Sequence, residues 1–63
     1  MTRPQAVLMA QRIAALAKAK RTDVALAARI ENAGIEFVTA ARAGDVKAEP
    51  PRWLNALLNE EVR

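Results

Sequence analysis

Residues 22–44 have the sequence TDVALAARIENAGIEFVTAARAG. This segment can form either two short helices or one long helix, and which of the two it forms depends on whether the backbone turns at Gly34. Residues 32–34 form a helix-stop signal, because glycine costs about 1 kcal/mol inside a helix and is the preferred left-handed C-cap. On a straight helix, Ile35 is also displaced from the apolar side and falls close to Arg42. A turn at Gly34 would let Ile35 point inward, so these signals predict two short helices.

The alternative is one uninterrupted helix over residues 23–43. Apolar side chains recur along the segment at intervals of three and four residues, which is typical of a single amphipathic helix. This row contains Leu26, Ile30, Ala33 and Phe37, and a parallel row contains Ala27, Gly34, Val38 and Ala41.

The flanking segments also predict helices. A first helix is expected after Thr2, with Pro4 in its first turn, and it should continue to about Lys20. Thr22 or Asp23 supplies the N-cap of the next helix. The first helix places its core stripe on one face, at Ala6, Met9, Ile13, Leu16 and Ala17.

The carboxyl-terminal third begins with a second glycine stop. Gly44-Asp45 predicts a C-cap, residues 46–51 form a loop, and Pro51 opens a last helix. Trp53 belongs to the apolar face of that helix, with Leu54, Leu57 and Leu58, so we expect it in the core. The sequence therefore predicts one all-α domain over residues 1–63, a compact four-helix domain with a central helix-turn-helix. The alternative is a three-helix bundle with one long helix over residues 23–43.

The composition limits the chemistry that the chain can perform. It has 63 residues, no cysteine and no histidine, which removes thiolate ligands, disulfides and the commonest general base and metal ligand. We therefore expect no enzyme, no cofactor and no metal site. No segment reaches the roughly 18 apolar residues of a membrane span, and Arg12 interrupts the amino-terminal apolar region, so we expect a cytoplasmic protein without a membrane partner.

Charge is distributed unevenly along the chain. Residues 1–21 hold five cations and no acid, giving +5, whereas residues 22–63 hold five cations and seven acids, giving −2. This asymmetry predicts a polyanionic partner or an acidic protein surface.

Two stretches resemble the small Cro and phage-repressor (Xre-type) DNA-binding domains. TDVALAA at residues 22–28 resembles the opening of the second helix of that family, and GIEFVTAARAG at residues 34–44 resembles a recognition helix. Two features depart from the pattern: Gly34 lies eight residues after Leu26 where the family has five, and Asp23 stands where the family often has Gln. The resemblance implies a phage- or prophage-type transcriptional regulator that binds double-stranded DNA as a dimer.

The resemblance also implies which side chains touch DNA. The candidates for reading bases are Glu36, Thr39, Ala40 and Ala43. The candidates for contacting phosphates are Lys18, Lys20, Arg21, Arg42, Lys47 and Arg52. The alternative function is a non-enzymatic helical interaction module, such as a phage-encoded inhibitor or adaptor, because small residues on two helices allow close approach of a partner or a second copy.

Overall fold

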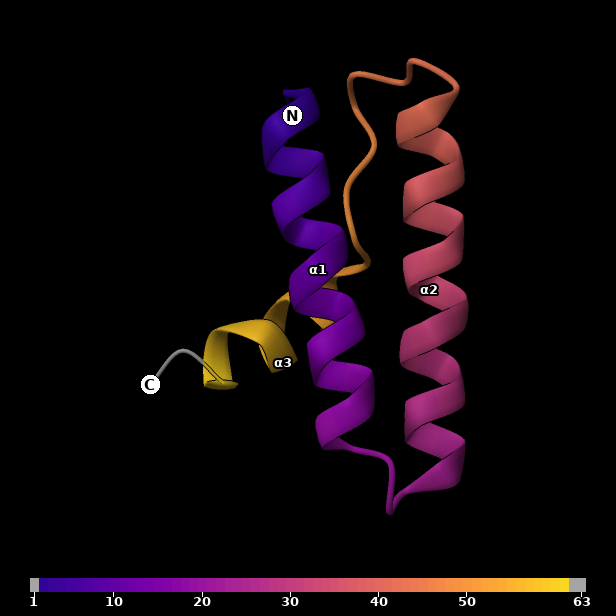
Figure 1. Ribbon diagram of the computed structural model, residues 1–63, viewed down its shortest axis with the longest axis vertical. Helices are drawn as coiled ribbons and strands as arrows, with labels where there is room; N and C mark the ends of the chain where they lie inside the picture. Colours follow the sequence, from indigo (N-terminus) through magenta and orange to yellow (C-terminus); the bar gives the residue numbers. More distant parts are fainter. Residues whose placement is uncertain (1, 62–63) are drawn as a thin grey trace.

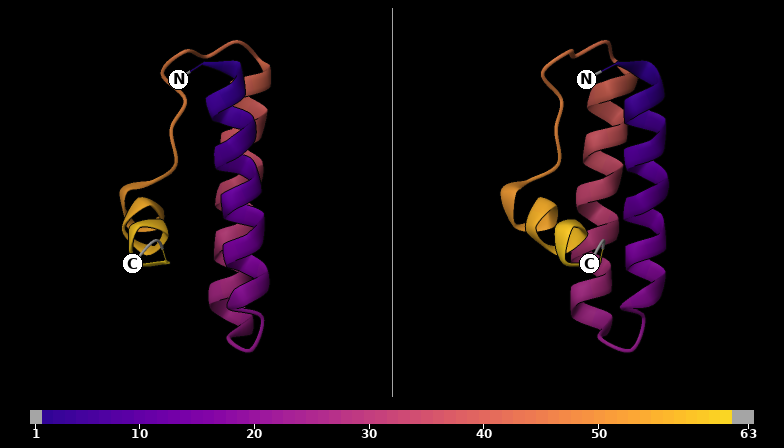
Figure 2. Two further views of the ribbon diagram at one scale, coloured as in Figure 1. Left: turned by 60° about the vertical axis from the view of Figure 1, so that its left-hand side comes forward. Right: turned by 90° about the vertical axis from the view of Figure 1, so that its left-hand side faces the viewer.

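The computed structural model describes residues 2–61 and contains three helices in that range, α1 (Arg3–Ala19), α2 (Val24–Arg42) and α3 (Arg52–Glu61). Helices α1 and α2 run antiparallel, side by side (Figure 1). Figure 2 shows that α3 and the segment before it lie on one side of this pair. The prediction of an all-α fold is confirmed; the four-helix arrangement is wrong, and the three-helix alternative fits.

Local signals explain where the first two helices begin. The Thr2 hydroxyl accepts from the Gln5 amide at 3.4 Å, and the Gln5 side chain accepts from the Thr2 amide at 2.8 Å, which completes a capping box. Asp23, rather than Thr22, caps α2, since its carboxylate accepts from the Leu26 amide at 3.1 Å. Both starts agree with the sequence prediction to within a residue or two.

Helix α2 is uninterrupted at Gly34, so the predicted turn there is wrong. A Cβ atom added at Gly34 would lie 2.8 Å from Cγ2 of Ile13 on α1, closer than real Cβ atoms come to another heavy atom. Glycine therefore serves the close approach of the two helices and not a stop. Ile35 stays 64% exposed instead of turning inward.

The true glycine stop is Gly44, which has φ +87°. Its amide donates to the Ala41 carbonyl at 3.2 Å, and the Asp45 amide donates to the Ala40 carbonyl at 3.1 Å. These two bonds form a Schellman motif, which satisfies carbonyls that the end of a helix leaves free. The predicted C-cap at Gly44 is confirmed.

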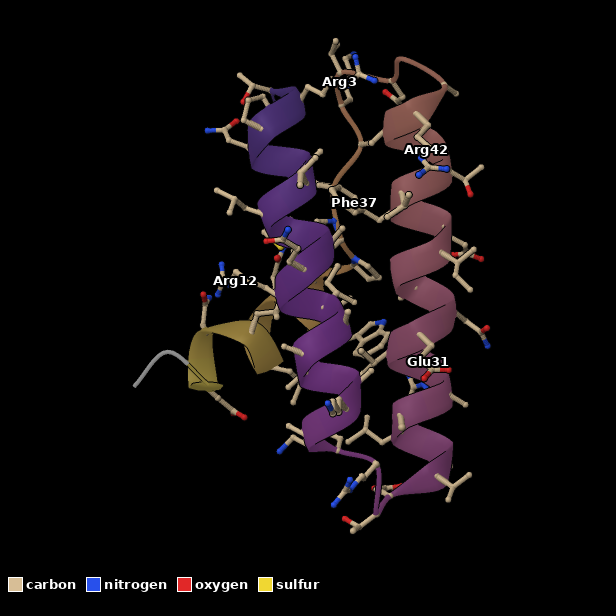
Figure 3. All side chains as sticks on the ribbon, viewed as in Figure 1. Arg3, Arg12, Glu31, Phe37 and Arg42 are labelled. Atoms are coloured by element: carbon tan, nitrogen blue, oxygen red, sulfur yellow. The ribbon has the colours of Figure 1, made fainter. Side chains whose placement is uncertain are left out.

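Residues 45–51, which we call the strap, begin with a turn at residues 46–47 and then run back along the α1–α2 hairpin to α3 (Figure 1). Ala48 of the strap is buried, and the Pro51 carbonyl accepts from the Leu54 and Asn55 amides at 3.0 Å each as α3 begins. The core draws on all three helices and the strap, and it comprises Ile13, Leu16, Ala17, Ile30, Ala33, Phe37, Ala48, Leu54 and Leu58. In Figure 3, Phe37 extends from α2 toward α1.

Polar contacts also link α3 to the hairpin. Arg12 of α1 donates to the Leu58 carbonyl at 3.4 Å, and the Arg29 guanidinium lies 4.8 Å from the centre of the Trp53 ring. Such a cation–π contact contributes about 0.5–1 kcal/mol at an exposed site. Trp53 is half-buried and packs against the core, as its place in the apolar stripe predicts.

Substitution of Gly34 tests the close approach. Gly34→Ala should lower the free energy of unfolding by about 1 kcal/mol, because an overpacking cost of about 1–3 kcal/mol exceeds the gain in helix propensity of about 1 kcal/mol. In an Ile13→Ala background, which removes the opposing methyl group, the same substitution should raise that free energy. Chemical denaturation of the natural chain, the two single variants and the double variant measures both effects. Equal effects of Gly34→Ala in the two backgrounds would contradict a close contact between Gly34 and Ile13.

Candidate interaction surfaces

The predicted phosphate-contacting side chains lie at different ends of the molecule. Lys18, Lys20 and Arg21 are at the turn between α1 and α2, whereas Arg42 and Lys47 are at the far end of α2, as the course of the chain in Figure 1 shows. At 1.5 Å per residue, the 19 residues of α2 separate the two groups by about 28 Å. That distance exceeds the screening length of about 10 Å at 0.1 M salt, so the groups act as separate charges.

Arg52 is at neither end, because it begins α3. The structure therefore does not bring the six cations into one continuous basic face. Their positive charge is divided between the hairpin turn, the opposite end of α2 and the start of α3.

The predicted base-reading residues do not share one environment, because two of the four border the strap. Glu36 and Ala40 line a hollow of about 340 Å³ beside the strap. Asp45 and Glu49 line the same hollow, with Lys47 as the cation among them. Three carboxylates around one hollow repel phosphate, so the local charge opposes the role that the resemblance implies.

The other two base-reading candidates are exposed. Thr39 faces solvent on the outer side of α2, and Ala43 is the C-cap residue at its end. Neither gives a long polar side chain that could reach into a groove.

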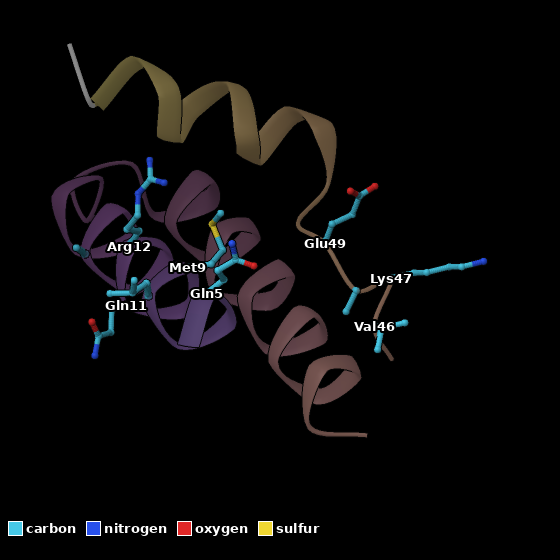
Figure 4. A pocket seen from close by; sticks show the side chains of 10 residues that line it. Gln5, Met9, Gln11, Arg12, Val46, Lys47 and Glu49 are labelled. Atoms are coloured by element: carbon cyan, nitrogen blue, oxygen red, sulfur yellow. The ribbon is translucent and has the colours of Figure 1, made fainter. Parts of the chain in front are cut away.

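A wider cleft separates α1 from the strap. Its volume is about 800 Å³, and Leu8, Met9 and Arg12 of α1 line it opposite Val46 of the strap. Figure 4 shows the α1 side chains and the strap side chains on opposite sides of this space. Leu8 is 60% exposed and Val46 is 75% exposed, so the apolar lining is open to solvent.

A second apolar surface lies on the side of the hairpin that α3 and the strap leave uncovered; we call it the hairpin face. Residues that touch α3, such as Arg12 and Arg29, point to the covered side. At about 100° per residue, the opposite side of each helix carries a different set of residues. The hairpin face comprises Val7, Ala10 and Ala14 on α1, and Val24, Ala27, Glu31, Ile35, Val38 and Arg42 on α2.

The hairpin face exposes large aliphatic side chains. Val7 is 52% exposed, Val24 is 77% exposed and Ile35 is 64% exposed. Figure 3 views the molecule from this side, and the labelled Glu31 and Arg42 both lie over the visible side of α2. Small residues between these side chains, such as Ala10, Ala14 and Ala27, would let another helix approach closely.

The interior of the described residues offers no reactive group. Every fully buried side chain among residues 2–60 is hydrophobic, and no buried side-chain nitrogen or oxygen there is left without a hydrogen-bond partner. In the same part of the chain, no three carboxylates gather closely enough to hold a metal ion. The features open to a partner are therefore on the outside.

The sequence predicts part of the hairpin face, because Ala10, Ala14 and Ala27 are among the small residues on two helices that indicate close approach of a partner. The displacement of Ile35 toward Arg42, which favours a turn when the sequence is considered alone, marks an exposed apolar side chain on one straight helix. The cleft had no comparable signal, because it depends on the path of the strap.

Comparison with protein-family models, curated proteins and solved structures gives no significant match for this chain. None of the three described helices is both long enough and apolar enough to cross a membrane. What the protein does must therefore be inferred from its own surfaces.

Proposed function

We propose that this chain is a non-enzymatic protein-interaction module whose hairpin face docks a helix of a partner polypeptide. The observation that carries the proposal is the uncovered side of the α1–α2 pair, where Val7, Val24 and Ile35 are each more than half exposed. Burying aliphatic surface of this kind stabilises a complex by about 25 cal/mol per Å² before the costs of association are subtracted.

The shape of the hairpin face supports a helical partner. Small side chains lie between the larger aliphatic ones on this face, at Ala10, Ala14 and Ala27, so the backbone of a partner helix can come close to it. A helix laid on such a face inserts its larger side chains between the small ones. The charged side chains of the face, Glu31 and Arg42, would then fix its direction.

Photo-crosslinking at Ile35 tests this function in cells that express the chain natively. A crosslinking amino acid at Ile35 should give adducts that protease destroys and nuclease does not. The matched control is Leu8, which is similarly exposed but faces the cleft, and it should give fewer adducts. Absence of protein adducts at Ile35, or equal yields at both positions, would overturn the proposal.

Duplex DNA is the second candidate partner, favoured by the five cations in residues 1–21 and by the resemblance to phage repressors. The proposal of a recognition helix has lost the turn on which it depended, because α2 continues through Gly34. The remaining basis is the cluster Lys18, Lys20 and Arg21 at the hairpin turn. A cluster of this kind binds a polyanion without reading its sequence.

A salt titration separates the two modes of DNA binding. Three phosphate contacts at the hairpin turn predict a log–log slope of affinity against salt near −3, whereas a docked recognition helix with about five contacts predicts −4 to −5. We expect a slope no steeper than about −3 and no change in sequence preference on Glu36→Ala or Thr39→Ala. A steeper slope, together with loss of preference in either variant, would instead support the repressor-like function.

A further inference from the structure

We infer that the partner of the hairpin face is a second copy of this chain, bound through antiparallel pairing of the two α2 helices. This inference rests on the proposed function and adds the identity of the partner. Its basis is the order of charged and apolar side chains along one side of α2.

Four residues form that side of the helix. Glu31, Ile35, Val38 and Arg42 are spaced by four, three and four residues, which at about 100° per residue confines them to roughly 60° of arc. Ile35 is 64% exposed, and Val38 is partly buried at the edge of the core. The row thus has an apolar centre with an acid on one side and a base on the other.

This row is complementary to itself when reversed. Glu31 and Arg42 lie equally far from the midpoint between residues 36 and 37, about 8 Å along the helix on either side at 1.5 Å per residue. Ile35 and Val38 are also equidistant from it, at about 2 Å. A two-fold axis through that midpoint therefore places Ile35 opposite Val38 of the copy, and each Glu31 opposite an Arg42. Contacts repeated in this reciprocal way define an isologous interface.

The position of Glu31 favours a second copy over an acidic partner or DNA. Glu31 is the acid that the hairpin face carries, and it lies amid aliphatic side chains, where a polyanion would leave it facing like charge. Pairing with Arg42 of the copy gives it an opposite charge instead. Arg3 and Lys18 are exposed on the same side of α1, and pairing through α2 leaves both outside the contacted row of residues.

The size of the chain gives self-association a physical benefit. A domain of about 60 residues buries only about 60% of the surface that its unfolded chain exposes, so its own core gives little stability. A bound copy stabilises the folded state by mass action. The dimer would also cover Ile35, the exposed aliphatic residue nearest the proposed axis.

Charge reversal with complementation tests the pairing. Sedimentation equilibrium should show a dimer for the natural chain, and Glu31→Arg or Arg42→Glu should each raise the dissociation constant about tenfold or more, because the two-fold axis creates two like-charge pairs. An equimolar mixture of the two variants should restore the dimer, since both ion pairs re-form in the heterodimer.

The matched control is Glu36→Arg, which makes the same charge change on the other side of α2 and should leave the dissociation constant within about twofold. Circular dichroism should show unchanged helix content in all variants. A monomeric natural chain at millimolar concentration, or a mixture no tighter than its components, would overturn the inference. Crosslinking of Ile35 to a different protein would contradict a second copy as the partner but would leave the proposed function intact. No crosslink at all would contradict both the inference and the proposed function.

Discussion

The contact between Gly34 and Ile13 is the constraint on which the rest of the structure depends. The missing side chain at Gly34 admits the Ile13 methyl group into a space where a Cβ atom would lie 2.8 Å from it. Because the helices approach closely there, Leu16, Ile30 and Phe37 can fill the seam on either side. The cost of glycine inside a helix, about 1 kcal/mol, is offset by this packing.

The same contact determines which surfaces remain open. A straight α2 keeps Ile35 on the outer side of the helix, whereas a turn at Gly34 would redirect it. Helix α3 covers only one side of the hairpin, where Trp53 and Leu58 contact Arg29 and Arg12. The uncovered side then carries aliphatic residues that a protein of this size cannot bury by itself. The proposed function follows from this unequal coverage.

The local chemistry of the sequence predicted most of the fold. The Thr2 and Asp23 caps, the stop at Gly44 and the last helix after Pro51 each depend on a few neighbouring residues, and the structure has them all. Gly34 and Gly44 carry the same local stop signal but have opposite roles. Only Gly44 has a positive φ, whereas Gly34 faces a side chain from a helix more than 20 residues earlier. A contact between distant residues of this kind is absent from any local pattern.

The candidate site was harder to predict than the fold, because it depends on how helices are placed in space. Charge counts correctly predicted a basic first third of the chain. They did not predict that Lys18 and Arg42 lie at opposite ends of the hairpin. Residue spacing correctly grouped Glu36 with Ala40. It did not predict that the strap brings Asp45 and Glu49 beside them. The small residues on the two helices indicated part of the hairpin face, whereas the meaning of Ile35 depended on whether α2 is straight.

Nuclear magnetic resonance of the chain in solution tests the continuity of α2 most directly. A continuous α2 predicts cross-peaks between the α-proton of Ala33 and the Glu36 amide and between the α-protons of Gly34 and the Phe37 amide. It also predicts contacts from the Ile13 methyl group to the α-protons of Gly34. Loss of these cross-peaks, together with contacts from Ile35 to the core residue Leu16, would show a turn at Gly34 and contradict the account.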